Sequence, residues 1–404
     1  MVPAGRFLPL LASTGLLTSA GVAGAEPQTS PITDSNYSIE LYDGVAIGNT
    51  AVVGMGGATV ALAIGTSGTL SNPSAPAVRP TTDKDWWSWD YHIDYLNGSL
   101  STDYDNNGFT HEEGGTSVLT LGFGLRFGDW AGAITGTQQF APVSDAFVMT
   151  PSDSMAQLQA SALRLQFALA RYIEPLDLAV GASVQAALFT LEPDCAGEGC
   201  DALFSVSGAG VELGATWLPR MQDFRIGAAL ASPITGSSFS GCDPMDCVGW
   251  VLPEKIVSPW RLAVGGAYRF GPTSWNQTVK GYFRDEKSVT IAADVVVTGS
   301  SENAFGLEAF GQHELQRSGR HPSLGVRGGV EYEWVPGRFR IRGGSYWEPG
   351  RFVGVSGRLH ATLGLELRVF QFWFWGSQRR GRLSLTSDVA RQYGNGGLSI
   401  GFWH

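Results

Sequence analysis

From residue 86 onward, apolar and polar residues alternate in a series of segments. Between Trp86 and Leu96, five aromatic or aliphatic residues are separated by Ser, Asp and His. Segments 119–127, 163–169 and 359–369 repeat this period of two. A period of two places one face of a strand in an apolar environment and the other face in a polar one. The series predicts roughly fourteen strands, and closed bacterial barrels have an even number.

The connections between these segments are long and short in turn. Gly128–Asp129 and Pro336–Gly337 are tight turns, whereas 97–115 and 231–258 are long. Outer-membrane barrels show this pattern, with long loops outside the cell and short turns in the periplasm. The sequence therefore predicts an antiparallel transmembrane barrel in the outer membrane of a Gram-negative cell, spanning residues 86–404.

Two stretches fit this pattern less well. Residues 271–288 are too long for a short turn, so we expect the strand around Val289 to begin earlier than its alternation shows. Residues 304–314 alternate weakly. We assign them to a loop, because one more strand would make the strand number odd.

Aromatic residues gather at the strand ends that adjoin the short turns. Aromatic side chains at one depth are typical of the girdle at a membrane interface. The expected members are Trp86, Trp130, Trp217, Phe270, Trp334, Trp373 and Trp403.

The segment 45–85 interrupts this regularity ahead of the strands. It is rich in Gly, Ala, Ser and Thr, nearly uncharged up to Ala77, and too broken by Gly and Pro for a long helix. Its apolar residues nevertheless need burial. We expect it to form a plug inside the space that the strands enclose.

The first residues carry an export signal. Arg6 precedes an apolar run, and Ala23-Gly24-Ala25 is a small-residue cleavage site, so residues 1–25 read as a signal peptide. Residues 26–44 are polar and predict an extended or disordered lead-in. After residue 25 there is no run of about 18 apolar residues, so we expect no transmembrane helix.

Composition agrees with a barrel of this kind. Charged residues make up 16% of the 404 residues, below the usual share of about a quarter, and there are 54 glycines. The mean hydropathy of +0.01 is far below that of a helical membrane protein. A large secreted β-sandwich or propeller is the alternative. The net charge of −10 argues against nucleic acid as a partner.

The four cysteines form two close pairs, Cys195 with Cys200 and Cys242 with Cys247. Export to an oxidising compartment favours two disulfides. Pairing between the two loops remains open, because four cysteines allow three pairings. A single four-thiolate zinc site is the alternative, although the spacing is looser than in usual zinc knuckles.

Charged residues occupy the polar faces of the later strands. Antiparallel neighbours place such residues side by side, so cross-strand ion pairs are expected. These charged side chains could contact a plug or a solute. We favour the interpretation that they neutralise one another within the barrel wall. The expected lumen-facing residues are Arg327, Glu331, Glu333, Arg338, Arg340, Arg342, His360, Glu366 and Arg368.

No catalytic constellation stands out. Neither the G-x-S-x-G nor the H-E-x-x-H pattern occurs, and the six His are scattered. Gly208, Gly210 and Gly214 lie inside an expected strand and are not a dinucleotide fingerprint. We therefore expect no enzyme activity, no cofactor and no metal.

Several motifs resemble the FadL-type long-chain fatty acid transporters. The run 54–63, GMGGATVALA, is similar to the Gly-rich opening of that family's plug, and 72–77, NPSAPA, to its N-P-A motif. Weaker likenesses occur at 252–269 and 342–364. The plug residues that carry the resemblance are Gly54, Gly56, Gly57, Ala58, Asn72 and Pro73.

The resemblance implies a fourteen-stranded outer-membrane barrel, filled by its plug, that takes up hydrophobic small molecules such as fatty acids or aromatic hydrocarbons. Three features depart from the family: Gly65-Thr66 replaces acidic residues, Ser74 replaces an alanine, and about twenty residues precede the plug. The same plug motif resembles relatives that serve secretion or surface attachment. A structural barrel without transport is therefore the alternative.

The residue pattern of the last strand predicts that it contacts the barrel assembly machinery and outer-membrane lipid. Leu398, Ile400 and Phe402 alternate, which resembles an assembly signal, although Trp403-His404 replaces the usual terminal Phe. This alternation predicts that all three side chains face lipid.

Overall fold

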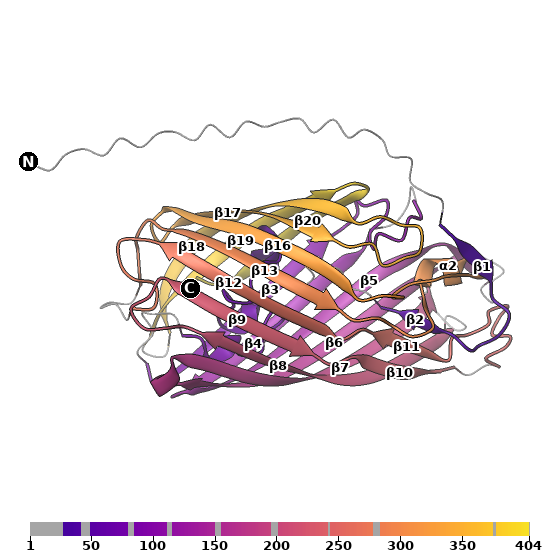
Figure 1. Cartoon of the computed structure of the whole chain (residues 1–404), viewed down its shortest axis with the longest axis horizontal. Helices are drawn as coiled ribbons and strands as arrows, with labels where there is room; N and C mark the ends of the chain where they lie inside the picture. The colour runs from indigo at the N-terminus through magenta and orange to yellow at the C-terminus, as the bar shows by residue number, and fades with distance from the viewer. Residues whose placement is uncertain are drawn as a thin grey trace, which may run out of the picture.

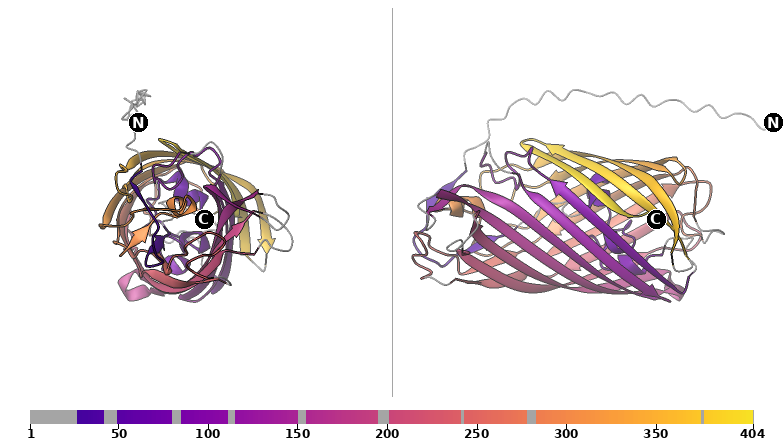
Figure 2. Two further views of the ribbon diagram at one scale, coloured as in Figure 1. Left: turned by 90° about the vertical axis from the view of Figure 1, so that its right-hand side faces the viewer. Right: turned by 180° about the vertical axis from the view of Figure 1, so that it is seen from behind.

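The computed structural model describes residues 27–41, 49–79, 85–110, 115–149, 155–194, 201–240, 243–277, 283–374 and 377–403. In these residues fourteen antiparallel strands form a closed barrel, as the alternation predicts (Figures 1 and 2). Each barrel strand pairs with the next along the chain, and β20 pairs with β3 to close the ring. The barrel strands are β3 (Trp87–Asn97), β4 (Ser117–Phe127), β5 (Trp130–Met149), β6 (Met155–Ile173), β7 (Leu178–Pro193), β8 (Phe204–Trp217), β9 (Phe224–Ala231), β12 (Arg261–Phe270), β13 (Val289–Thr298), β16 (Ser323–Val335), β17 (Phe339–Glu348), β18 (Arg358–Phe374), β19 (Ser377–Ala390) and β20 (Tyr393–Phe402).

The outer surface of the barrel is apolar. In β4 the buried and exposed residues alternate strictly, and the exposed ones are Leu119, Leu121, Phe123, Leu125 and Phe127. The opposite face of the strands points inward and carries most of the charged residues. An apolar exterior with a polar interior is the surface of a membrane-spanning barrel, the class found in bacterial outer membranes. No helix among the described residues is long and apolar enough to cross a membrane.

The aromatic girdle has six of its seven expected members. Their exposed fractions run from 41% to 71%. Trp403 is the exception, because it is 6% exposed and lies inside the barrel beside Arg340. Leu398 and Ile400 face outward as expected. Phe402 lies on the same face of β20, but it is only 2% exposed, because it packs on the rings of Trp89 and Tyr91.

The physical reason is strand parity. The ladder between β20 and β3 stops at Gly401 and His92, but β20 stays paired with β19, where Phe402 opposes Gly381 and the Trp403 amide donates to the Arg380 carbonyl. The alternation therefore continues to this end of the strand and places Trp403 on the inward face, with Ser399 and Gly401.

Other expectations about the connections have mixed outcomes. β5 extends to Met149, well beyond the strand end expected at Phe140. β13 begins at Val289, so the stretch 271–288 is a long connection and not an earlier strand start. Residues 304–314 are no barrel strand, as expected; they form the short strand β14 (Ala304–Phe305), α2 (Leu307–Gly311) and the first residue of β15 (Glu314–Gln316).

The lead-in of the chain lies at the end of the long connections. β1 (Thr29–Pro31) pairs with β15. β2 (Ser38–Glu40) runs parallel to both β11 (Lys255–Ser258) and β14. β10 (Ile234–Phe239) pairs with β8 and β11 in the same region. We call residues 27–41 the strap, because they cross this end of the barrel.

The strap is firmly packed. Tyr37 and Ile39 are 2% and 0% exposed, in a cluster with Phe204, Trp250 and Phe310. The Tyr37 hydroxyl donates to the Val251 carbonyl at 2.6 Å, and burial raises the pKa of that hydroxyl. A disordered lead-in could not bury these groups, so the polar composition of 26–44 was a poor guide to residues 27–41.

Residues 49–79, which we call the internal segment, lie inside the ring of strands (Figure 2). They contain α1 (Thr50–Gly54), η1 (Thr66–Gly68) and η2 (Ala75–Ala77). Their hydrogen bonds reach Asp94 of β3, Thr216 of β8 and Asp294 of β13, which lie on different sides of the ring. The chain thus runs from the strap through the barrel before it enters β3.

Glycines in the wall allow the internal segment to approach. A Cβ on Gly344 would lie 2.4 Å from the backbone nitrogen of Gly56, which itself has a φ of +59°. No side chain fits between two backbones at this distance. Wall glycines with the same close approach are Gly181, Gly214, Gly227 and Gly329.

Gly344→Ala tests this packing. The added methyl group overpacks against backbone that cannot move aside, so we expect a loss of about 1–3 kcal/mol in stability. The matched control is Gly343→Ala, because the nearest atom to a Cβ there is 3.9 Å away. Urea unfolding in detergent measures both variants. Equal stability of the two would contradict the close packing.

Cysteine labelling tests the position of the strap. Thr33 is exposed in the strap, and Asp129 lies in the short turn between β4 and β5. If long connections face outward, a membrane-impermeant maleimide should label Thr33→Cys on intact cells but leave Asp129→Cys unlabelled. Labelling of Asp129→Cys alone would reverse the orientation.

Candidate functional site

Asn72 joins the two halves of the internal segment to the wall. Its side-chain nitrogen lies 3.0 Å from the Val60 carbonyl and 3.2 Å from the Thr216 hydroxyl of β8. Its side-chain oxygen accepts from the amide and the hydroxyl of Ser74. Ser74 is fully buried and also bonds Thr216 at 2.8 Å. The serine that departs from the N-P-A pattern therefore belongs to this network.

The remaining plug-motif residues surround α1 and the following turn. Gly54 ends α1, and its carbonyl accepts from the Thr362 hydroxyl of β18. Gly56 and Gly57 have positive φ angles, and Ala58 is fully buried. The Pro73 carbonyl lies against Gly181 of β7. All six motif residues therefore lie at contacts or turns of the internal segment.

Three aspartates of the wall hold the internal segment by its backbone. Asp94 accepts from the amide of Thr50, and Asp90 accepts from the amide of Thr66 at 2.8 Å. On the far side of the ring Asp294 accepts from the amide of Val60 at 3.0 Å. These bonds satisfy buried amides that have no partner in regular secondary structure.

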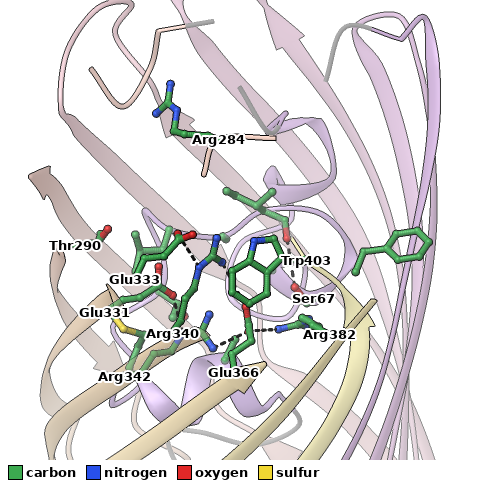
Figure 3. Close-up of a pocket in the computed structure, with 18 of the residues that line it drawn as sticks. Ser67, Arg284, Thr290, Glu331, Glu333, Arg340, Arg342, Glu366, Arg382 and Trp403 are labelled. Carbon is green, nitrogen blue, oxygen red and sulfur yellow. Dashed lines mark hydrogen bonds and ion pairs between the residues drawn. The ribbon is translucent and has the colours of Figure 1, made fainter. Parts of the chain in front are cut away.

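Most of the expected lumen-facing charges form one ion-pair network around Glu366 (Figure 3). Glu366 accepts from Arg342 and Arg382, each at 2.8 Å, and from Arg340 at 3.3 Å. The network links four adjacent strands, so much of this charge is neutralised within the wall. Its outer partners are Glu331, 2.7 Å from Arg342, and Glu333, 3.1 Å from Arg340.

The other expected charges have different surroundings. Arg327 donates to the Gly57 carbonyl at 3.3 Å and so contacts the internal segment. The His360 ring lies between Glu348 and Asp388, at 3.0 and 2.9 Å.

Two of the expected lumen-facing arginines lie near the short-turn end. Arg338 does not face the lumen, because it is exposed in the turn between β16 and β17. Arg368 is half-buried and pairs in register with Arg382, next to a bulge in β18.

A cavity of about 330 Å³, the lower cavity, lies between the internal segment and the wall near the short turns. Val52, Met55 and Leu62 of the internal segment contribute apolar lining. Trp403 reaches into it from the chain end (Figure 3). Its size lies within the range of about 300–1,000 Å³ that is usual for small-molecule sites.

A second cavity of about 170 Å³, the upper cavity, lies toward the strap. Leu41, Leu70 and Ile234 are among its lining residues. Val52 and Ser71 line both cavities. The internal segment therefore separates the two spaces by little more than the thickness of these side chains.

Arg225 of β9 gives the lower cavity an unusual charge. It is 2% exposed, and its Nε donates to Asn276 at 2.9 Å. Its Nη1 has no hydrogen-bond partner among the described residues, and its guanidinium lies over the Trp275 ring, 4.1 Å from the ring centre. Arg269 and Arg284 lie close by and share one carboxylate, Glu286. This side of the cavity therefore carries excess positive charge.

The sequence analysis missed Arg225, Ser74 and Trp403 as site residues. Arg225 alternates with Phe224 and Ile226, which are less buried, so strand parity alone would have placed it inward. Strand parity with the buried Ser399 and Gly401 would likewise have placed Trp403 inward.

Cys247 is the one cysteine among the described residues, and it is disulfide-bonded. Cys195, Cys200 and Cys242 lie outside the described residues, so the pairing stays a prediction. The signal peptide also lies outside them.

Comparison by sequence finds no matching family model and no matching curated protein. Comparison by structure finds several solved channels. The "CymD monoaromatic hydrocarbon channel" has 12% identity and a TM-score of 0.53, covering 90% of this chain and 97% of that one. The Pseudomonas putida toluene transporter TodX, at 12% identity and a TM-score of 0.52, covers 89% and 98%.

A Pseudomonas aeruginosa FadL homologue also matches, with 12% identity and a TM-score of 0.51 over 89% of this chain and 98% of that one. Likeness at this identity concerns the fold alone. The chain has the fourteen-stranded barrel fold of the FadL-type channels.

Proposed function

We propose that this protein is an outer-membrane channel for the passive uptake of hydrophobic compounds. The observation that carries the proposal is the pair of cavities on either side of the internal segment, inside a barrel with an apolar exterior. Backbone without regular pairing at membrane depth is tolerated only where protein buries it or where it lines a cavity. The internal segment does both, as a plug of a channel must.

In this proposal, the solute moves from the upper cavity to the lower cavity past Val52 and Ser71. Both residues line both spaces, so a small displacement of α1 would join them. α1 has five residues, and it is held to the wall by the Asp94 carboxylate, which accepts from Thr50, by the Thr362 hydroxyl, which donates to the Gly54 carbonyl, and by glycine contacts. A solute therefore needs to disturb few bonds to pass.

The lower cavity favours a solute with an apolar body and an anionic head. Val52, Met55 and Leu62 would contact the body, and Arg225 would bind the head through its free Nη1. An arginine that is buried without a carboxylate partner is costly, and a ligand carboxylate would offset that cost. Long-chain fatty acids have this chemistry, whereas aromatic hydrocarbons would use only the apolar lining.

The proposal includes the surroundings of the barrel. The exposed apolar residues would contact outer-membrane lipid, and the last strand would engage the barrel assembly machinery. Residues 45–85 would form the plug as one unit, preceded by the signal peptide and the lead-in. A barrel that serves attachment or secretion without transport is the competing function, and the experiments below separate the two.

Deletion of residues 49–72 should open the barrel. The strands would remain paired to each other, while the material that fills the lumen is lost. We expect larger planar-bilayer conductance than for the intact protein, and loss of selective fatty acid uptake in cells. If both proteins conduct equally and neither binds a hydrophobic probe, the competing function is the better explanation.

Arg225→Gln should weaken binding of a long-chain fatty acid by about ten-fold or more, since a hydrogen bond to a charged group contributes about 1.5–3 kcal/mol. Binding of the methyl ester should not change, because the ester carries no charge. The matched control is Arg220→Gln, which alters an exposed ion pair in a short turn. Fluorescent-probe displacement in detergent measures all three. A similar loss for acid and ester would refute the role of Arg225 as head-group ligand.

A further inference from the structure

One wall of the upper cavity carries mostly neutral hydrogen-bonding groups. Around Glu366 the wall of β16 to β19 is charged, whereas the polar residues of β5, β6 and β7 that line the upper cavity are mainly hydroxyls and amides. They are Thr135, Thr137, Gln139, Gln166 and Gln185, together with the charged Arg164. The strand register pairs Thr135 with Gln166, and Gln166 with Gln185. Neutral donors and acceptors therefore lie side by side across three neighbouring strands.

Thr135 has a buried hydroxyl group that is left unpaired. The residue is 1% exposed, and its Oγ1 has no hydrogen-bond partner in the part of the chain that the structure describes. Thr137, the next inward threonine of the same strand, differs because its hydroxyl lies 3.3 Å from the hydroxyl of Thr120. A buried polar group without a partner is unfavourable. The Thr135 hydroxyl therefore requires a partner from outside the protein, which is either water or a ligand.

Gln166 supplies a second unpaired atom next to Thr135. The residue is 3% exposed, and its Nε2 donates to the Glu212 carboxylate and to the Ser183 hydroxyl, each at 2.9 Å. It also reaches the Thr69 carbonyl at 3.4 Å. A carboxylate and a carbonyl only accept, so these contacts fix which end of the amide is the nitrogen. The opposite end, Oε1, is an acceptor without a hydrogen-bond partner among the described residues.

A hydroxyl group can satisfy both unpaired atoms at once. It donates its hydrogen to the Gln166 oxygen and accepts the hydrogen of the Thr135 hydroxyl. A carboxylate has no hydrogen to donate to the Gln166 oxygen. An ammonium group is disfavoured by charge, because the arginines at positions 164, 261 and 327 line the same cavity. The two unpaired atoms therefore select a neutral group that both donates and accepts.

We propose that the upper cavity binds the hydroxyl group of a hydrophobic alcohol or phenol through Thr135 and Gln166. Leu41, Leu70 and Ile234 supply apolar lining for the body of such a solute, in a space of about 170 Å³. The inference rests on the proposed uptake function and adds hydroxylated hydrophobic compounds to its solutes. These compounds would form their hydrogen bonds in the upper cavity, whereas a carboxylate would bind Arg225 in the lower one.

Three probes of similar shape test this site on the purified full chain in detergent. A naphthol donates and accepts hydrogen bonds, the corresponding methoxynaphthalene only accepts, and the corresponding methylnaphthalene does neither. Fluorescence titration measures the dissociation constant of each probe. The comparison is made for one probe between protein variants, so that the partition of the probe into detergent cancels.

Thr135→Val keeps the shape of the side chain and removes its hydroxyl. The dissociation constant should rise about two- to ten-fold for the naphthol and the methoxynaphthalene, because each loses one neutral hydrogen bond. It should not change for the methylnaphthalene. Gln166→Met should weaken binding of the naphthol alone, since only the naphthol donates to the Gln166 oxygen.

Thr386→Val is the matched control. It removes another buried hydroxyl that has no hydrogen-bond partner among the described residues, but Thr386 of β19 lines neither cavity. Its affinity for all three probes should equal that of the original protein.

Thermal unfolding separates ligand binding from a structural role of Thr135. Without a probe, Thr135→Val should unfold no lower than the original protein, because it loses an unpaired buried group. Added naphthol should raise the unfolding temperature of the original protein more than that of Thr135→Val. Should Gln166→Met fail to fold after losing its bond to Glu212, Thr135→Val decides alone.

Two results would overturn the hydroxyl site. One is naphthol binding that neither Thr135→Val nor Gln166→Met weakens, which is also the result for a site that holds only water. The other is an equal loss for all three probes. In both cases, binding of the methylnaphthalene by the original protein would still support the uptake channel. If the original protein binds none of the probes and no fatty acid, the hydroxyl site and the proposed function both fail.

Discussion

The close contact between the internal segment and a set of wall glycines constrains the rest of this structure. Gly344 and Gly214 meet the backbone of Gly56 and the side chain of Asn72 at distances that leave no room for a Cβ. This contact fixes how closely the internal segment approaches the wall. Because backbone meets backbone, the fit depends on shape more than on apolar area, and the segment can be both irregular and buried.

Charge is arranged around that contact in two ways. Where the wall faces itself, Arg and Glu alternate between adjacent strands. The network is largely neutral, because Glu331, Glu333 and Glu366 balance its three arginines. Where the wall faces the internal segment, single aspartates accept backbone amides. Arg225 fits neither arrangement. It is buried beside other arginines, and its own Nη1 has no hydrogen-bond partner among the described residues. The lower cavity owes its chemical character to this exception.

The two ends of the barrel are closed by different physical means. At the long-connection end, the strap adds a parallel strand and fills an apolar cluster, so this closure resembles a small protein core. At the short-turn end, Trp403 lies inside the barrel with its ring beside Arg340. The first closure is an extended apolar cluster, whereas the second consists of a few side chains.

The sequence by itself determined the barrel, because strands with a period of two, joined by connections that are long and short in turn, are typical of a membrane-spanning sheet that closes on itself. It also determined the buried irregular segment and most of the inward charges, since strand parity fixes the side of each residue. Only the tertiary structure decided the rest. The polar strap is ordered by partners more than 200 residues away, and Phe402 is covered by aromatic rings of β3. Such contacts depend on three-dimensional closure, which local patterns do not encode.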